Sequence, residues 1–525
     1  MMIKTSATAL LFLLSAQYLL ASDWPQWRGP QRNGVSLDTH SLANKFPEGG
    51  PRLLWQSEEE IPSNDDGGFG SPIVVDGKVY LSVVWHRDVP TPSRTIDGLV
   101  MRSLGGNGGG IPQAVKEKTE AARKSRSPRL RGTALDEWTT NWIKENLTKE
   151  EQINYDWWVA GRIKKGPSAI DLADIEKIRA AQNKVFEDAA AFDTWLAGLD
   201  VPDRVKEEVL RKTPDTKKVA NDVILCLDGE SGKTLWKAEL EGAPTGRGSA
   251  STPCYDEGRI YAAGSERVFC VDAQLGEVIW DTPNPAKGPA SSPMVYGNTV
   301  LVASNGLRAL DATNGKEKWM QNDVNHNNAS PVVWDSTDNP VIFCNSKSEL
   351  KALDFGTGEI LWTLPGGGDS TPSVVGDHLA VYGKGAKNKP HELMLFMLKP
   401  DSEPSLLWKF DNLTRRASSS PIIENGRVHL IGGELHFCAD LEAGDPVWKE
   451  SRSSNISSPI LADGKIYGFE KNASDLVVID ANADQHTELA RAKVSALKCT
   501  SPAFAGGKLF VRTDDRIACY DLREN

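Results

Sequence analysis

The chain has 525 residues, a formal net charge of -11 at pH 7, and 39% hydrophobic against 25% charged residues. This composition excludes a disordered or fibrous protein and provides enough apolar material for a large core. The negative charge also argues against nucleic acid as a general partner, because phosphate binding needs a basic surface that releases counterions.

The first 22 residues have the layout of a signal peptide. Lys4 precedes an apolar run from Ala9 to Leu20, and Ala21 and Ser22 come before a polar, tryptophan-rich sequence. A membrane anchor is the alternative, but roughly a dozen apolar residues are short for the 20 or so that a spanning helix needs. We therefore expect export to the periplasm or the cell exterior, and a mature chain without an integral membrane segment.

A Ser/Thr-Pro dipeptide followed by an apolar strand is the main repeat of the chain. Apart from one gap of 181 residues, consecutive prolines of this repeat lie 38 to 49 residues apart, which is the length of a four-stranded propeller blade. The prolines are Pro72, Pro253, Pro293, Pro331, Pro372, Pro421, Pro459 and Pro502. The repeat predicts an all-β fold, an eight-bladed β-propeller.

The gap is predicted to be an α-helical insertion in the first blade. We expect the second strand of that blade at Lys78 to Trp85 and the third at Val223 to Leu227, so residues 86–222 are inserted between them. The propeller then comprises residues 23–85 and 223–525. The loop between strands two and three emerges on the face that rings the channel mouth, so we expect the insertion to be a cap there.

Within the insertion, apolar residues at three- and four-residue steps from Asp171 to Leu199 predict helix, and another helix is predicted from Val201 to Lys212. One helix face is predicted to hold Leu172, Ile175, Ile178, Val185 and Phe186. Tryptophans can stack on sugar rings or form the core of a small helical unit. The insertion holds Trp138, Trp142, Trp157, Trp158 and Trp195, and we favour the core role for them.

A second signature, Asp-x3-Gly-x3-Trp, follows later in most of the repeats, as in Asp272, Gly276 and Trp280. The Asp can bond the backbone of the turn, the Gly supplies a positive φ, and the Trp falls on the outer strand, where it can fill the wedge between blades. The last unit ends after Asp521 without such a strand. We expect the segment around Trp55 to complete the blade of Phe510 to Asp521 and close the ring.

The segments just before each Ser/Thr-Pro ring the channel mouth and are mostly small and polar. Their serines and glycines allow strands to start close to the axis, which is a structural role. Several segments add one larger group, and these are Arg247, His326, Asn327, Asp369, Arg415, Arg416, Asn455 and Lys498. Converging donors with few acids predict a site for an anionic or polyhydroxylated ligand.

The repeat sequence ALDATNGKEKW, from Ala309 to Trp319, resembles the repeats of the quinoprotein (PQQ) alcohol dehydrogenase-like propeller superfamily. The segment DWPQWRGP, from Asp23 to Pro30, resembles secreted bacterial PQQ-like repeat proteins. The resemblance covers about Asp23 to Trp85 and Val223 to Asn525. It implies the propeller fold, and a superfamily that includes both dehydrogenases and a non-enzymatic outer-membrane assembly propeller.

Two functions follow from this resemblance. A PQQ-dependent oxidoreductase acting on alcohols or sugars would, by the family pattern, hold calcium with acidic and amide groups beside the quinone, and often carry an adjacent cysteine pair. The chain has no Cys-Cys dipeptide, and Asp369 is the sole acid among the larger mouth groups. We favour a binding or scaffolding module for a small molecule or an envelope protein, and assign no catalytic, cofactor-binding or metal residue.

The seven cysteines show neither CxxC nor CxxCH spacing, so neither a zinc cluster nor a haem attachment is predicted. Four of them recur two residues before an Asp: Cys226, Cys270, Cys438 and Cys519. Recurrence at one position of a repeat is typical of small buried packing residues.

Overall fold

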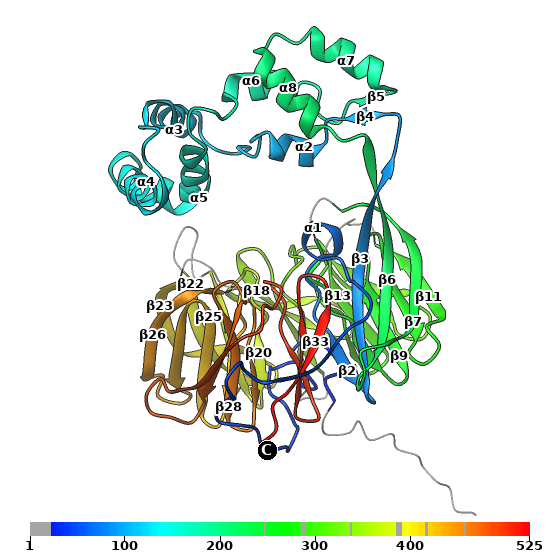
Figure 1. Ribbon diagram of the computed structural model, residues 1–525. Helices are drawn as coiled ribbons and strands as arrows, with labels where there is room; N and C mark the ends of the chain where they lie inside the picture. The colour runs from blue at the N-terminus through cyan, green and yellow to red at the C-terminus, as the bar shows by residue number, and fades with distance from the viewer. Residues whose placement is uncertain are drawn as a thin grey trace, which may run out of the picture.

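The computed structural model describes residues 23–245, 248–284, 290–335, 339–384, 391–414, 418–455 and 457–524, so the predicted signal peptide lies outside the described residues. A ring of antiparallel sheets forms one part of the molecule, and a group of helices stands above it (Figure 1). No described helix is long and apolar enough to cross a membrane.

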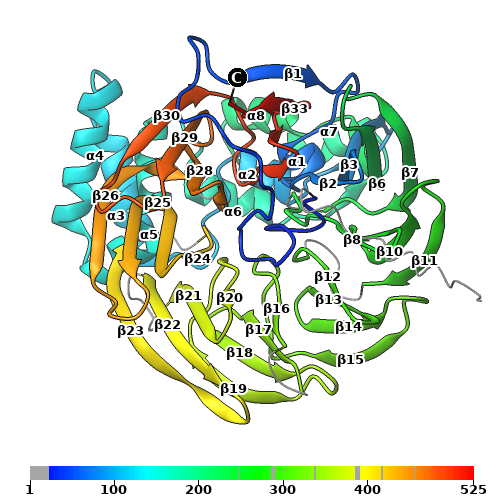
Figure 2. The ribbon, with the colours of Figure 1, turned by 90° about the horizontal axis from the view of Figure 1, so that it is seen from below.

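Seven four-stranded sheets and one three-stranded sheet follow one another around the ring, and each proline of the repeat directly precedes the inner strand of one sheet (Figure 2). In chain order the sheets consist of β2 (Ile73–Val75), β3 (Lys78–Pro90), β6 (Thr216–Asp228), β7 (Thr234–Gly242); β8 (Cys254–Asp256), β9 (Arg259–Ala263), β10 (Arg267–Asp272), β11 (Val278–Pro283); β12 (Met294–Tyr296), β13 (Thr299–Ala303), β14 (Leu307–Asp311), β15 (Glu317–Gln321); β16 (Val332–Trp334), β17 (Val341–Asn345), β18 (Glu349–Asp354), β19 (Ile360–Pro365); β20 (Ser373–Val375), β21 (His378–Lys384), β22 (His391–Lys399), β23 (Ser402–Thr414); β24 (Ile422–Glu424), β25 (Arg427–Asp440), β26 (Pro446–Asn455); β27 (Ile460–Ala462), β28 (Lys465–Glu470), β29 (Asp475–Asp480), β30 (Glu488–Lys493); and β31 (Ala503–Ala505), β32 (Lys508–Arg512), β33 (Ile517–Asp521) with β1 (Arg52–Gln56). This mostly-β architecture is that of a propeller.

The Asp-x3-Gly-x3-Trp signature joins neighbouring sheets. The Gly of one turn lies against the Trp of the preceding sheet: a Cβ on Gly276 would lie 2.6 Å from Cε3 of Trp236. The same glycine has a φ of 74°, so both the backbone and the contact require it. Trp280 in turn donates from its indole nitrogen to the carbonyl of Ala312 at 3.0 Å. The tryptophans therefore fill the wedges between sheets, as the sequence predicted.

The ring closes through strands from both ends of the chain. β1 pairs with β33 in antiparallel register, with Leu53 opposite Tyr520 and Trp55 opposite Cys519. The Trp55 ring also packs against Phe510 with 5.9 Å between ring centroids. The prediction that Trp55 completes the last sheet is confirmed.

A closed circle of hydrogen bonds links the starts of the eight inner strands. The backbone N–H of each Ser or Thr before the repeat proline donates to the hydroxyl of its counterpart in the next sheet, over 2.9 to 3.2 Å. The circle runs through Ser71, Thr252, Ser292, Ser330, Thr371, Ser420, Ser458, Ser501 and back to Ser71. These hydroxyls are buried acceptors, so the Ser/Thr-Pro motif is structural.

The segment that precedes β1 fills the centre of the ring from the side opposite the helices (Figure 2). Arg28 is 2% exposed and donates through Nη2 to the carbonyls of Asn33, at 2.8 Å, and Pro421. Arg32 donates to the carbonyls of Ser292, at 2.6 Å, and Pro293, at 3.0 Å. Burial lowers the pKa of Arg28 to about 9 and that of Arg32 to about 10. The DWPQWRGP segment and its neighbours are thus a plug of the channel.

The helical part consists of α2 to α8 and the two-stranded sheet β4–β5, all between β3 and β6 in the chain. The elements are β4 (Arg94–Thr95), α2 (Gly98–Ser103), α3 (Gln113–Ser125), α4 (Gly132–Asn146), α5 (Lys149–Lys165), α6 (Leu172–Arg179), β5 (Val185–Phe186), α7 (Ala189–Ala197) and α8 (Asp203–Lys212). It stands over the ring face that carries the short helix α1 (Asn64–Gly67) (Figure 1).

Two boundaries differ from the prediction. β3 and β6 continue past Trp85 and Val223 and stay paired up to Pro90 opposite Thr216, because their side chains keep supporting the ladder: Arg87 donates to Asn221 at 2.7 Å. The prediction of one helical face from Leu172 to Phe186 is also wrong, because Val185 and Phe186 form strand β5, which pairs with β4. The helix after Pro202 is confirmed as α8.

The helical part has two hydrophobic cores. One gathers residues of α2, α6, α7 and α8 around Ile175 and Val205, and the other gathers residues of α3, α4 and α5 around Val115 and Trp158. Trp138 and Trp142 pack against the second core and Trp195 against the first. Four of the five tryptophans therefore have packing roles, whereas Trp157 is 55% exposed.

Candidate functional site

A polar pocket of about 340 Å³ opens where the segments before β16 and β20 meet. Its lining brings together three of the predicted mouth residues, His326, Asn327 and Asp369. Nε2 of His326 lies 3.2 Å from Oδ1 of Asp369, and the same oxygen accepts from Nδ2 of Asn328 at 2.9 Å. The pocket thus spans two neighbouring sheets and is held by bonds between them.

The hydrogen bonds of His326 define its tautomer. Nδ1 accepts from the backbone N–H groups of Asn327, at 2.9 Å, and Asn328, at 3.0 Å. Because Nδ1 is an acceptor, the proton is on Nε2 and points at Asp369. Both ring nitrogens are therefore engaged in contacts within the protein. The imidazole orients the carboxylate and the loop rather than presenting a free base.

Amide groups make up most of the remaining wall. Asn305, Asn325 and Asn328 join the pocket, and Lys347 adds a cation at its edge. Asn327 accepts from the backbone N–H of Asn305 at 2.6 Å, and the Asn325 backbone N–H donates to Ser346 at 3.1 Å. Each amide offers both a donor and an acceptor, and one carboxylate adds a strong acceptor. The pocket is therefore lined mainly by amide groups, with one carboxylate and one cation.

Asn305 and Lys347 were missed at the sequence level. Asn305 lies between β13 and β14, and Lys347 lies between β17 and β18, so both belong to loops that join the second and third strands of a sheet. These loops emerge on the mouth face, by the same geometry that placed the insertion there. Asn328 stands beside the predicted Asn327 in the segment HNNASP. These residues could have been found by including, for every repeat, the loop between its second and third strands among the mouth segments.

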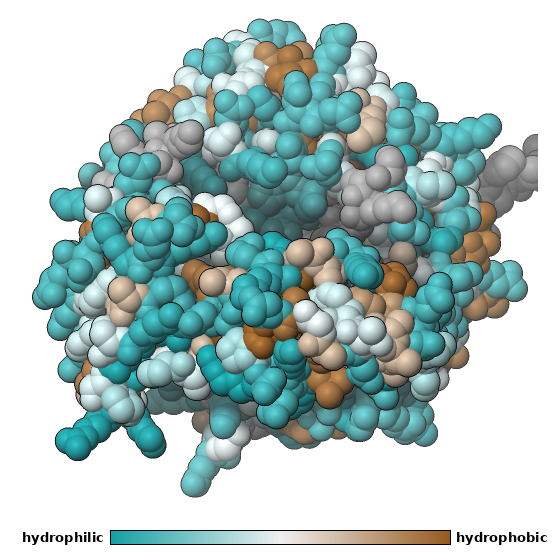
Figure 3. Space-filling model, turned by 90° about the horizontal axis from the view of Figure 1, so that it is seen from above, coloured by the Kyte–Doolittle hydropathy of each residue, from teal (hydrophilic) through white to brown (hydrophobic). Residues whose placement is uncertain are grey.

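Lys498, another of the predicted mouth residues, is not among the residues that line this pocket. Lys498 lies in the segment between β30 and β31, and its Nζ is 5.9 Å from the centre of the Phe69 ring. Asn455 ends strand β26. Arg247, Arg415 and Arg416 lie outside the described residues. Seen from above, the molecule is largely hydrophilic and hollowed near its centre (Figure 3).

A PQQ site of the family pattern would need acidic and amide groups that hold a calcium ion beside the quinone. Among the described residues, no group of three or more His, Cys, Asp or Glu side chains is placed to hold a metal ion. Asp369 contacts His326 and Asn328, and Asp66 is paired with Lys218 at 2.6 Å. Both carboxylates therefore already have partners within the protein.

The repeated cysteines are packing residues. Cys226, Cys270, Cys438 and Cys519 are all buried thiols within their sheets, as predicted. Burial raises the pKa of each to about 12, so at neutral pH none is the thiolate that a nucleophile or metal ligand requires.

Comparison with known proteins agrees with the repeat. Residues 220–365 match the family model for the outer membrane protein assembly factor BamB. A tetrathionate hydrolase of Acidithiobacillus ferrooxidans is 24% identical over 280 residues, 46% of this chain and 53% of that protein. The chain therefore matches about half the length of this curated relative.

Solved structures similar to this chain include BamB of Moraxella catarrhalis, with a TM-score of 0.46 and 16% identity over 58% of this chain and 89% of that one. A quinohemoprotein alcohol dehydrogenase of Pseudomonas putida HK5 has a TM-score of 0.41 and 11% identity over 58% of this chain and 72% of that one. The repeats and the family match confirm the predicted resemblance to the PQQ-like β-propeller superfamily.

Proposed function

We propose that this protein is an exported binding module that takes a polyhydroxylated ligand in the mouth pocket around Asp369. The convergence of amide groups and one carboxylate on a pocket of about 340 Å³ carries the proposal, because that volume and that pattern of donors and acceptors suit a saccharide. The plug closes the ring from below, so a ligand enters and leaves on the mouth side. The plug therefore supports a role in binding rather than in transport through the channel.

The proposal includes an eight-bladed ring with the helical part as a cap of the mouth. Eight hydroxyl bonds in a closed circle support the blade count. The ladder from Lys78–Asp228 to Pro90–Thr216 supports the insertion, because it carries the chain up to the helices and back as one hairpin. Lys218 on this hairpin bonds Asp66 of α1 at 2.6 Å, which ties the base of the cap to the mouth.

Saccharide binding tests the proposal. We expect at least one of maltose, cellobiose and gluconate to bind saturably in isothermal titration calorimetry, and Asp369→Ala or Asn328→Ala to weaken binding roughly tenfold, about 1.4 kcal/mol. Asn314→Ala is the matched control, because Asn314 lies in a turn between β14 and β15, on the opposite face. Absence of binding by all three probes, or equal binding by the Asp369 variant, would contradict the proposal.

An oxidoreductase is the alternative. We expect the purified protein, after incubation with PQQ and calcium, to retain no quinone chromophore and to reduce no artificial electron acceptor with alcohols or aldoses. We expect this because Asp369 and Asp66, the carboxylates near the mouth, pair with His326 and Lys218. Absorbance after gel filtration and a dye-reduction assay measure this. Stoichiometric quinone retention would contradict it and turn the mouth residues into cofactor ligands.

A further inference from the structure

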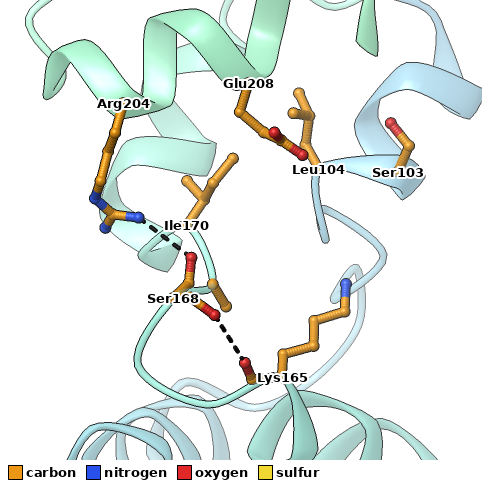
Figure 4. A pocket seen from close by; sticks show the side chains of 8 residues that line it. Ser103, Leu104, Lys165, Ser168, Ile170, Arg204 and Glu208 are labelled. Atoms are coloured by element: carbon orange, nitrogen blue, oxygen red, sulfur yellow. Dashed lines mark hydrogen bonds between the residues drawn. The ribbon is translucent and has the colours of Figure 1, made fainter. Parts of the chain in front are cut away.

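A second pocket lies in the helical part, at the junction of its two cores (Figure 4). It has a volume of about 300 Å³. Each core belongs to one lobe of the helical part: α3 to α5 form one lobe, and α2 with α6 to α8 form the other. Lys165, the last residue of α5, borders the pocket from the first lobe, while Arg204 and Glu208 of α8 border it from the second. Leu104 and Ile170, from the segments that connect the lobes, form an apolar wall. A molecule in this pocket would therefore contact both lobes at once.

The pocket has an excess of positive charge. The Lys165 ammonium group points into it (Figure 4), and within the described part of the chain no carboxylate lies within 4.0 Å of that group. Arg204 donates to the carbonyl of Ser168 at 3.2 Å, and no salt bridge joins its guanidinium to a carboxylate of the described residues. Glu208 is the one acid of the lining, and Arg211 already neutralises it through bonds of 2.5 to 3.0 Å.

A buried arginine behind Lys165 adds a second observation. Arg162 is 3% exposed and binds Glu120 through Nε at 2.6 Å, but its Nη1 is buried without a hydrogen-bond partner among the described residues. A Cβ on Gly105 would lie 3.1 Å from this Nη1 and 3.4 Å from Nζ of Lys165. Gly105 has a φ of 95°, which favours glycine, and the absence of a side chain there leaves both donors facing the same point.

The neighbouring cations also act on Lys165. Desolvation, followed by the charges of Arg162 and Lys212, lowers the pKa of its ammonium group. A bound anion would offset this repulsion and give Nη1 of Arg162 and Nζ of Lys165 an acceptor. The apolar wall of Leu104 and Ile170 would accept the hydrocarbon body of the same molecule.

We propose that this pocket binds a small organic carboxylate, and that the ligand joins α5 to α8 and so fixes the two lobes of the helical part relative to each other. The carboxylate lies against Lys165, with Nη1 of Arg162 behind it and Arg204 across the pocket, and its apolar body lies against Leu104 and Ile170. This site is separate from the mouth pocket and does not depend on the saccharide proposal.

The test uses 4-fluorobenzoate as the probe and fluorine NMR of the full chain. We expect saturable binding, at least tenfold weaker for Lys165→Met and for Arg204→Gln, and unchanged for the control Lys164→Met, because Lys164 pairs with Asp136 at 2.7 Å away from the pocket. Neutral 4-fluorobenzyl alcohol and inorganic sulfate should each bind at least tenfold more weakly than the carboxylate.

Thermal unfolding establishes that each variant is folded. If Lys165→Met does not fold, the affinity of Arg204→Gln for 4-fluorobenzoate tests the proposal alone. The proposal is overturned if 4-fluorobenzoate does not bind saturably or if both pocket variants bind it as tightly as the native chain. Equal binding of the alcohol would show an apolar pocket only, and equal binding of sulfate would show a simple anion site. Either result would also refute the organic carboxylate.

Discussion

A chain that begins at Gly67 is expected to lose the cooperative folding of the ring. This truncation removes β1 from the edge of β33 and exposes its unpaired backbone groups. It also removes Trp24 and Trp55 from the core, each of which is worth about 3 to 5 kcal/mol as a buried aromatic residue. The loss approaches or exceeds the 5 to 15 kcal/mol by which a typical domain is stable.

The plug adds to this effect. Without it, the carbonyls of Pro421, Ser292 and Pro293 lose the guanidinium donors of Arg28 and Arg32 inside the channel. Urea unfolding followed by circular dichroism measures the result, and a chain that begins at Asp23 is the control, with full stability expected. An unchanged unfolding midpoint for the shorter chain would refute the closure of the ring by the N-terminal segment.

Replacing Ser420 by Ala is expected to lower the free energy of unfolding by about 1 to 3 kcal/mol. The Ser420 hydroxyl accepts from the buried backbone N–H of Thr371 at 3.0 Å, so the alanine variant leaves that donor without a partner in the described structure. Ser420→Thr is the matched control, because Thr252 and Thr371 occupy the same place in other sheets. We expect the threonine variant to stay within about 1 kcal/mol of the native chain.

Equal stability of the alanine and threonine variants in urea titration would show that the hydroxyl circle contributes nothing. The serine would then only provide a small side chain near the axis, which was the expectation from the sequence. The distinction could not be made from the sequence, because small size and acceptor capacity come together in serine. Only the register between neighbouring sheets shows that every hydroxyl reaches the next backbone N–H.

The periodic features of the fold could be predicted from the sequence because they repeat. The spacing of the prolines and of the Asp-x3-Gly-x3-Trp signature reports a local unit whose geometry is the same each time, and the missing outer strand after Asp521 pointed to Trp55. The single features could not be predicted in this way. Arg28 acts through carbonyls that lie more than 340 residues away in the chain, and no period marks that contact.

Periodicity also explains why two of the predicted mouth residues line one pocket. His326 and Asp369 lie 43 positions apart, close to one repeat, so the topology brings them together. Lys498 precedes a different sheet of the ring, and its ammonium group lies near Phe69 rather than in the pocket of His326 and Asp369. The extent of the helical insertion was missed by a few residues because β3 and β6 extend beyond the repeat length.

The affinity of the mouth pocket in the presence and absence of the helical part tests whether that part caps the pocket. Residues 91–215 are replaced by Asn-Gly, since Pro90 and Thr216 already face each other and a two-residue turn can join them. We expect the shortened ring to unfold cooperatively. We also expect it to bind the saccharide with the highest affinity in the panel at least threefold more weakly than the intact chain does. A shortened chain that does not fold, or that binds this saccharide as tightly as the intact protein, would contradict this proposal.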